Sequence, residues 1–146
     1  MPKQTQDELV KILETRYNVF FTPVRGKKVF YDTNINGKRS VVLCSPCSKI
    51  HKDGQGWIDL TKIQIDLLAE YNAALLAFRL PNRQAYYVNY QQIRSLLTEA
   101  CIFDNSREGV HWKLYIWPER IEVRKNKRTL NLASNSFENI DVIFRG

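Results

Sequence analysis

The sequence predicts one α/β domain in which helices flank a mixed central sheet and a β-rich C-terminal extension follows. Two apolar runs surround Asn36-Gly37 within residues 29–43, a pattern typical of a β-hairpin with a two-residue turn. Residues 73–80 (AALLAFRL) are almost continuously apolar and too few for a helix, which indicates a central strand covered on both faces. With 146 residues, the chain is long enough to bury a core as a single domain.

A helix and a short strand are expected before the hairpin. Thr5 and Glu8 have the spacing of a capping box, and apolar residues follow at helical intervals, so the pattern predicts a helix over 6–17. The apolar residues 19–21 predict a short strand. After the hairpin, residues 45–56 are rich in Ser, Pro, Gly, Lys and Asp and are expected to form a loop.

The second half is expected to contain two more helices and a series of strands. Thr61 is a suitable N-cap for a helix that reaches about residue 71, and Asn89 for a short helix after an edge strand at 84–88. Further strands are expected at 111–117, at 120–124 and near 129–132. Residues 1–100 would then form the core and residues 101–146 a β-hairpin extension of the same domain.

Basic residues outnumber acidic ones, with 22 Lys and Arg, 15 Asp and Glu, and a net charge of +7. Such an excess attracts polyanions, of which nucleic acid is the commonest. A strand at 111–117 also places Lys113, Tyr115 and Trp117 on one face, which suits base stacking, although a packed edge hairpin explains the same pattern. The expected partner is DNA, with a solvated basic surface as the alternative. The candidate nucleic-acid-binding residues are Arg25, Lys27, Lys28, Lys38, Arg39, Lys113, Arg124, Lys125, Lys127 and Arg128.

Neither an export signal nor a membrane span is expected from the sequence. Residues 1–10 lack the apolar core of a signal peptide, and no apolar run approaches about 18 residues. A cytoplasmic location is therefore expected, in which the three cysteines would be reduced thiols.

The order helix, three-stranded meander, helix, strand resembles the core of the PD-(D/E)xK nuclease superfamily, which includes restriction endonucleases and Holliday-junction resolvases. Residues 56–97 are most similar to the resolvase branch, in which a glutamine-bearing helix leads into an apolar strand with a basic end. Gln64 and Arg79 stand at those places. The resemblance, which covers residues 5–97, implies a restriction-endonuclease-like αβββαβ core. It also implies a Mg²⁺-dependent endodeoxyribonuclease or resolvase that acts as a homodimer.

In this family, an aspartate on one hairpin strand and an acid-x-lysine motif on the next hold a divalent cation and position the attacking water. By resemblance, Asp32 would bind Mg²⁺, Lys49 would orient the water or stabilise the phosphate, and Gln64 would support the site. Asp32 also suits a turn-forming role, since Asp is common where strands end. Arg79 lies in an apolar strand, where a buried guanidinium is expected to need an anionic partner.

The second acidic position departs from the family pattern. Residues 43–45 (LCS) hold neither an acid nor a lysine, and residues 47–49 (CSK) restore only the lysine. The missing metal-binding carboxylate would have to come from Glu14 or Asp59. Without it, the resemblance implies a non-catalytic nucleic-acid-binding or assembly module that has lost the metal site.

Two alternatives concern the cysteines. Cys44 and Cys47 have the spacing of a thiol redox motif, but the residues that follow them lack the apolar period of a helix. With His51 they also have the spacing of three zinc ligands, for which Cys101 or His111 would be a distant fourth. The second compact ligand pair of a structural zinc site is missing, so zinc is not favoured. A cysteine on a strand also serves simply as a small buried apolar residue.

Overall fold

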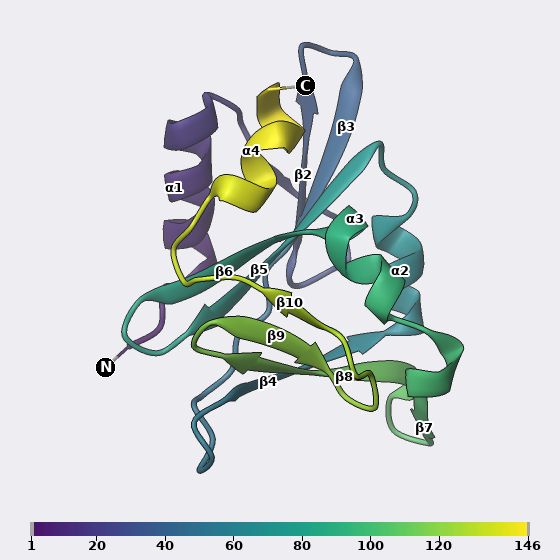
Figure 1. The fold of residues 1–146 in the computed structure, drawn as a ribbon. Helices are drawn as coiled ribbons and strands as arrows, with labels where there is room; N and C mark the ends of the chain where they lie inside the picture. The colour runs from purple at the N-terminus through teal and green to yellow at the C-terminus, as the bar shows by residue number, and fades with distance from the viewer. Residues whose placement is uncertain (1, 146) are drawn as a thin grey trace.

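The computed structural model describes residues 2–145, which form two β-sheets and four α-helices (Figure 1). Sheet A has the strand order β1-β2-β3-β5-β6 and sheet B the order β10-β9-β8-β4, with β7 also paired to β8. The strands of sheet A are β1 (Thr22–Pro23), β2 (Phe30–Ile35), β3 (Arg39–Cys44), β5 (Ala73–Leu80) and β6 (Gln84–Asn89). Those of sheet B are β4 (Gly56–Thr61), β7 (Phe103–Asn105), β8 (Gly109–Trp117), β9 (Arg120–Val123) and β10 (Thr129–Asn131).

Sheet A is mixed, because β3 and β5 are parallel while all its other neighbouring strands are antiparallel. The predicted hairpin is confirmed, with Asp32 opposite Val42 and a turn in which Asn36 and Gly37 both have positive φ. That conformation suits the right-handed twist of the two strands, and Asn and Gly adopt it readily. The predicted central strand at 73–80 is also confirmed, and all its residues after Ala73 are buried.

Two helices cover one face of sheet A. The helix α1 (Gln6–Tyr17) begins with the predicted capping box between Thr5 and Glu8. The helix α4 (Glu138–Arg145) was not predicted, although Ile140 and Ile143 recur at helical spacing and are buried. Residues from both helices share one apolar cluster with the strands beneath them, including Leu9, Leu13, Leu43, Leu75, Ile140 and Ile143.

Sheet B packs against the opposite face of sheet A, where the restriction-endonuclease-like arrangement leads one to expect helices. The apolar cluster between the sheets contains Val42 and Leu76 of sheet A together with Leu60 and Leu114 of sheet B. The helix α2 (Lys62–Leu68) adds Leu68 to this cluster. The short helix α3 (Tyr90–Ile93) and the 3₁₀ turns Arg94–Leu96 and Glu99–Cys101 follow β6.

The two sheets do not separate at residue 100, where the sequence predicted a boundary between core and extension. β4 lies before that point and β8 after it, yet they pair along their length, with Asp59 opposite Lys113. Both strands alternate buried and half-buried residues. The apolar side of β4 therefore needs a sheet of its own, and β8 supplies its partner.

Two smaller differences from the predicted elements concern where a strand begins and where a helix ends. Residues 19–21 are not a strand, because the Glu14 carboxylate of α1 accepts a hydrogen bond from the Phe21 backbone N–H at 2.8 Å, and β1 begins only at Thr22. The helix α2 ends at Leu68, before the predicted end near residue 71. None of the helices within residues 2–145 is both long and apolar enough to cross a membrane.

Candidate functional site

Asp32, the predicted metal ligand, lies on β2 and lines a pocket of about 650 Å³ beside the C-terminal end of α1. The Tyr71 hydroxyl donates a hydrogen bond to Asp32 Oδ2 at 2.8 Å. Burial, together with this hydrogen bond, raises the pKa of Tyr71 to about 12, so Tyr71 remains a neutral donor. Among residues 2–145, Asp32 is the only charged residue that lines the pocket, so these residues offer a cation a single carboxylate there.

The other predicted metal ligands do not join Asp32. The Glu14 carboxylate is held by the Phe21 backbone N–H, and Asp59 lies on β4 in sheet B. Val42, the residue directly opposite Asp32 in the hairpin, is fully buried and apolar. The predicted set of Asp32, Glu14 and Asp59 is thus not assembled by the fold.

The predicted supporting residues have other surroundings. Lys49 is exposed in the loop between β3 and β4. Gln64 completes a capping box at the start of α2, in which its side chain accepts from the Thr61 N–H at 3.0 Å and its own N–H donates to Thr61 Oγ1 at 3.2 Å. Its polar atoms therefore stabilise the helix start.

Arg79 is buried, as predicted, but three neutral oxygens take the place of the expected anion. Its guanidinium donates to Ser45 Oγ at 3.0 Å, to the Ser45 carbonyl at 2.8 Å and to the Gln4 carbonyl at 2.9 Å. No ion pair to Arg79 occurs within residues 2–145. The side chain joins the end of β3, the end of β5 and the segment before α1.

The cysteines are free thiols in different environments. Cys44 is fully buried and its burial raises the pKa of the thiol to about 12, whereas Cys47 is exposed. A thiol with so high a pKa is a poor nucleophile near neutral pH. Cys44, Cys47 and His51 do not converge into a metal-binding group in the described part of the chain.

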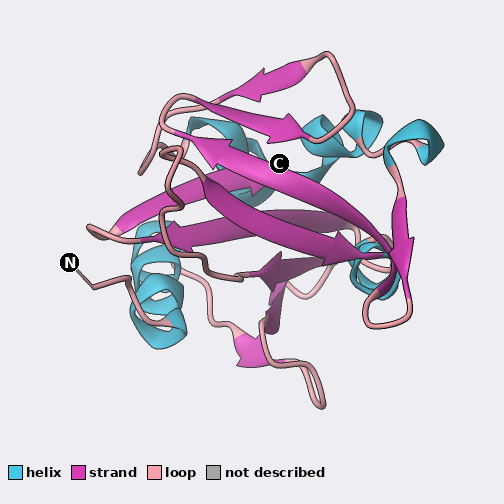
Figure 2. Ribbon diagram, turned by 90° about the horizontal axis from the view of Figure 1, so that it is seen from below, coloured by secondary structure: helices cyan, strands magenta, loops and turns pink. Residues whose placement is uncertain are grey.

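The outer face of sheet B, which points away from sheet A, gathers aromatic and basic side chains. Because residues alternate along β4, β8 and β9, the apolar ones point into the core and the others outward. Figure 2 views the molecule from this side, and no helix lies across the strands of sheet B. We define the aromatic face by its rings and cations, which are Trp57, Phe103, Tyr115, Trp117, Lys113, Arg120, Arg124 and Lys125.

The rings and cations of the aromatic face interleave. The Trp57 and Tyr115 ring centroids are 5.3 Å apart, and those of Tyr115 and Trp117 are 6.5 Å apart, both edge to face. The Lys125 ammonium lies 4.1 Å from the centroid of the Phe103 ring, and the Arg120 guanidinium 5.0 Å from that of Trp117. All four rings are partly exposed, so their surfaces are accessible to a ligand.

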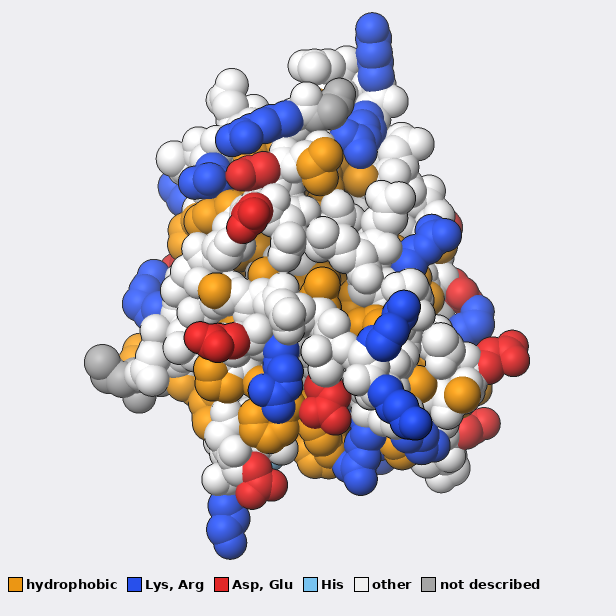
Figure 3. Space-filling model, viewed as in Figure 1, with side chains coloured by type: hydrophobic (Ala, Val, Ile, Leu, Met, Phe, Trp, Pro, Cys, Tyr) orange, Lys and Arg blue, Asp and Glu red, His pale blue; other side chains and the backbone are white. Residues whose placement is uncertain are grey.

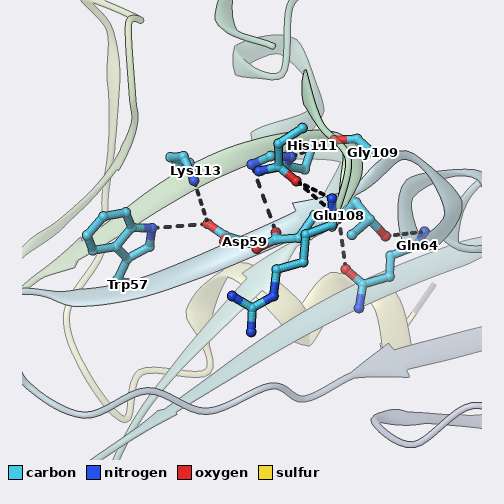
Figure 4. Close-up of polar contacts among 10 residues, drawn as sticks. Trp57, Asp59, Gln64, Glu108, Gly109, His111 and Lys113 are labelled. Carbon is cyan, nitrogen blue, oxygen red and sulfur yellow. Dashed lines mark hydrogen bonds and ion pairs between the residues drawn. The ribbon is translucent and has the colours of Figure 1, made fainter. Parts of the chain in front are cut away.

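Two carboxylates and one imidazole lie close together at one end of the aromatic face (Figure 4). Asp59 on β4, Glu108 in the turn before β8 and His111 on β8 each place one ligand atom within 4.8 Å of the others. His111 Nδ1 lies 2.8 Å from the Gly109 carbonyl, and Nε2 lies 3.9 Å from Glu108 Oε2. Asp59 Oδ1 accepts from Trp57 Nε1 at 3.0 Å and lies 3.7 Å from Lys113 Nζ. Asp59 is therefore near carboxylate and imidazole groups, but not those that the sequence suggested.

The predicted basic residues do not form one surface. Lys and Arg are scattered over the face seen in Figure 3. Lys113, Arg124 and Lys125 belong to the aromatic face, whereas Arg39 donates to the Ile143 carbonyl of α4 at 2.7 Å and stabilises that helix. Arg25, Lys27, Lys28 and Lys38 are exposed in the turns before β2 and β3. Lys127 and Arg128 are exposed in the turn before β10.

Glu108 was not predicted as a site residue, and His111 was predicted only as a distant fourth ligand of the zinc alternative. The alternation at 111–117 places His111 on the same face as Lys113, and Asn-x-x-Glu-Gly at 105–109 is typical of a tight turn. The missing information was the pairing of β4 with β8, which brings Asp59 to them.

The chain matches no protein-family model, no curated protein and no solved structure.

Proposed function

We propose that this chain binds single-stranded DNA through the aromatic face of sheet B. The observation that carries the proposal is the gathering of four partly exposed rings and four cations on a face that no helix covers. Proteins that bind single strands combine a basic surface for the backbone with rings on which bases stack.

The arrangement suits a single strand better than a duplex. Every base has a π-face, so a ring on a flat sheet can stack on an unpaired base of any sequence, whereas the bases of a duplex stack on one another. The cations of Lys125, Arg120 and Arg124 lie over the rings, 4.1, 5.0 and 5.7 Å from the ring centroids, and from there they can reach the phosphates that flank a stacked base. Two acids on this face already have donors, because Glu122 accepts from Trp117 Nε1 at 2.8 Å and Asp59 accepts from Trp57.

Under this proposal, the chain resembles the PD-(D/E)xK superfamily in its scaffold and not in its metal site. The order α1, meander β1-β2-β3, then α2 and β5 parallel to β3 supports a restriction-endonuclease-like core, in which β4 of sheet B is inserted between β3 and α2. Within that core, the Asp32 pocket has a single carboxylate and no lysine. Of the two functions that the resemblance implies, this pocket favours the non-catalytic binding module over a Mg²⁺-dependent endonuclease centred on Asp32.

The test is the affinity for a fluorescent oligo-dT, measured by anisotropy, with duplex DNA and a matching RNA as competitors. We expect Tyr115→Ala and Trp117→Ala each to weaken binding by about 1–3 kcal/mol, or roughly 5- to 150-fold. Tyr115→Phe keeps the ring and should bind nearly as the wild type does.

Phe20→Ala is the matched control. Phe20 is the most exposed large apolar residue within residues 2–145, at 77%, but it lies at the Asp32 pocket and not on sheet B. The proposal is refuted if Tyr115→Ala binds as the wild type does, or if Phe20→Ala weakens binding as much as Trp117→Ala. Preferential displacement of oligo-dT by duplex DNA would also contradict it, and preference for the RNA would replace DNA as the partner.

A further inference from the structure

We propose that Asp59, Glu108 and His111 form a binding site for one divalent first-row transition-metal cation, of which Mn²⁺ and Zn²⁺ are the representatives. The ligand atoms of the three side chains all lie within 4.8 Å of one another. Bonds of about 2.0–2.2 Å around one metal hold its ligand atoms roughly 3–4 Å apart. The observed group therefore needs only small side-chain movements to close on a cation.

His111 is the residue that distinguishes this group from an ordinary acidic cluster. Its side chain is fully buried, and Nε2 has no hydrogen-bond partner among residues 2–145. Nδ1 faces the Gly109 carbonyl at 2.8 Å, and because a carbonyl only accepts, Nδ1 carries the proton. In the neutral ring, the lone pair is then on Nε2, which points at Glu108 and Asp59 (Figure 4).

This arrangement of the imidazole is the one that metal sites use. A metal-binding histidine usually donates its second ring N–H to a carbonyl or a carboxylate, which fixes both the tautomer and the orientation of the ring. Gly109 provides that carbonyl here.

Glu108 is held in place by a tight turn. Asn105 Oδ1 accepts from the N–H groups of Arg107 at 3.0 Å and of Glu108 at 2.7 Å, and Asn105 pairs with Gly109 across the hairpin of β7 and β8. Gly109 has a φ of 68°, which an L side chain rarely adopts. The turn thus fixes Glu108 three residues before His111, on the same side of the hairpin.

Asp59 is oriented by one side chain of its own strand, Trp57, and by one of the neighbouring strand, Lys113. Trp57 Nε1 donates to Asp59 Oδ1 at 3.0 Å and Lys113 Nζ lies 3.7 Å from the same oxygen, which leaves the second oxygen for a cation. Two carboxylates and one ammonium leave this location with an excess of negative charge. Such a charge attracts a cation.

The donor set decides the class of ion. Carboxylate oxygens bind Mg²⁺, Ca²⁺ and Mn²⁺, whereas imidazole suits Zn²⁺, Fe²⁺ and other transition metals. Mn²⁺ and Zn²⁺ accept both carboxylate and imidazole ligands, so one nitrogen and two carboxylates suit either ion. The proposal concerns metal binding, and it is independent of whether the aromatic face binds DNA.

The test is metal binding by the full chain in a Cys47→Ser background, which removes the exposed thiol as a competing zinc ligand. We expect about one equivalent of Zn²⁺ by calorimetry and of Mn²⁺ by electron paramagnetic resonance. Glu108→Gln and Asp59→Asn keep the size of the side chains. Each should lower the affinity for Zn²⁺ and for Mn²⁺ by at least about ten-fold. Asp104→Asn, on the adjacent strand β7 and outside the group, is the matched control and should bind normally.

A second measurement needs no substitution of the buried histidine. In ¹⁵N spectra of imidazole groups, Zn²⁺ should shift Nε2 of His111, while His51, the only other histidine, provides the internal reference. Absence of stoichiometric binding by the Cys47→Ser chain would overturn the proposal. So would undiminished binding by Glu108→Gln, or a Zn²⁺ shift confined to His51.

Discussion

Replacing Arg79 with methionine removes the donors that join three separate segments of the chain. The guanidinium makes hydrogen bonds to the Ser45 carbonyl, to Ser45 Oγ and to the Gln4 carbonyl, and both residues are buried. A typical hydrogen bond contributes about 1 kcal/mol, and a buried acceptor left without a donor costs about 1–3 kcal/mol. Arg79→Met should therefore lower the free energy of unfolding by about 3 kcal/mol or more.

The assay is urea denaturation followed by tryptophan fluorescence, together with a thermal scan, in which we expect the midpoint to fall by about 10 °C. Arg83→Met is the matched control on the turn that follows β5. Arg83 pairs with Glu8 at 3.0 Å, but both side chains are largely exposed, so the change should be small. If Arg79→Met destabilises the chain no more than Arg83→Met does, the three hydrogen bonds do not hold the segments together.

Three further predictions concern salt, charge and pH. If the cations Lys113, Arg120, Arg124 and Lys125 all meet phosphates, the affinity for oligo-dT should fall by roughly 50-fold between 50 and 200 mM salt, and an affinity unchanged by salt would exclude this contact. Lys113→Met removes a positive charge beside Asp59, so it should strengthen Mn²⁺ binding and weaken oligo-dT binding. If the affinities for Mn²⁺ and oligo-dT both fall, the metal and the DNA do not have separate contacts. Burial raises the pKa of Tyr71 from 10.0 to about 12, so its stabilising contribution is complete below pH 10.0 and is lost as the pH rises to about 12. Denaturation at successive alkaline pH values should show this loss, and Tyr71→Phe should reduce the slope.

Local patterns predicted the elements whose cause is local. The Thr5 and Glu8 capping box fixes the start of α1, and Asn36-Gly37 fixes the turn of the hairpin, so both could be inferred from neighbouring residues. The central strand at 73–80 could be predicted from composition and length. The run is too short for a helix, and an almost continuously apolar strand is typical of one covered on both faces. The helix α4 has only 8 residues, so the helical spacing of Ile140 and Ile143 repeats too few times to predict a helix from the sequence.

The candidate site could not be predicted because it depends on pairing between distant segments. The sequence predicted Asp59 as a metal-binding carboxylate beside Asp32. Its actual neighbours are determined by the register of β4 against β8. No local pattern states which of several strands will be the partner. The same lack of long-range information explains the expectation of an anion beside Arg79, whose acceptors come from residues 4 and 45.

The pairing of β4 with β8 also determines when the molecule can complete its folding. During synthesis, β4 leaves the ribosome long before β8, so Ile58 and Leu60 have no strand beside them until the chain has grown past residue 116. The N-terminal segments can pair early, but both the aromatic face and the group around His111 come into existence only when β8 docks. Hydrogen exchange at the amides of β4 should therefore become slow late in refolding, at the same moment as those of β8.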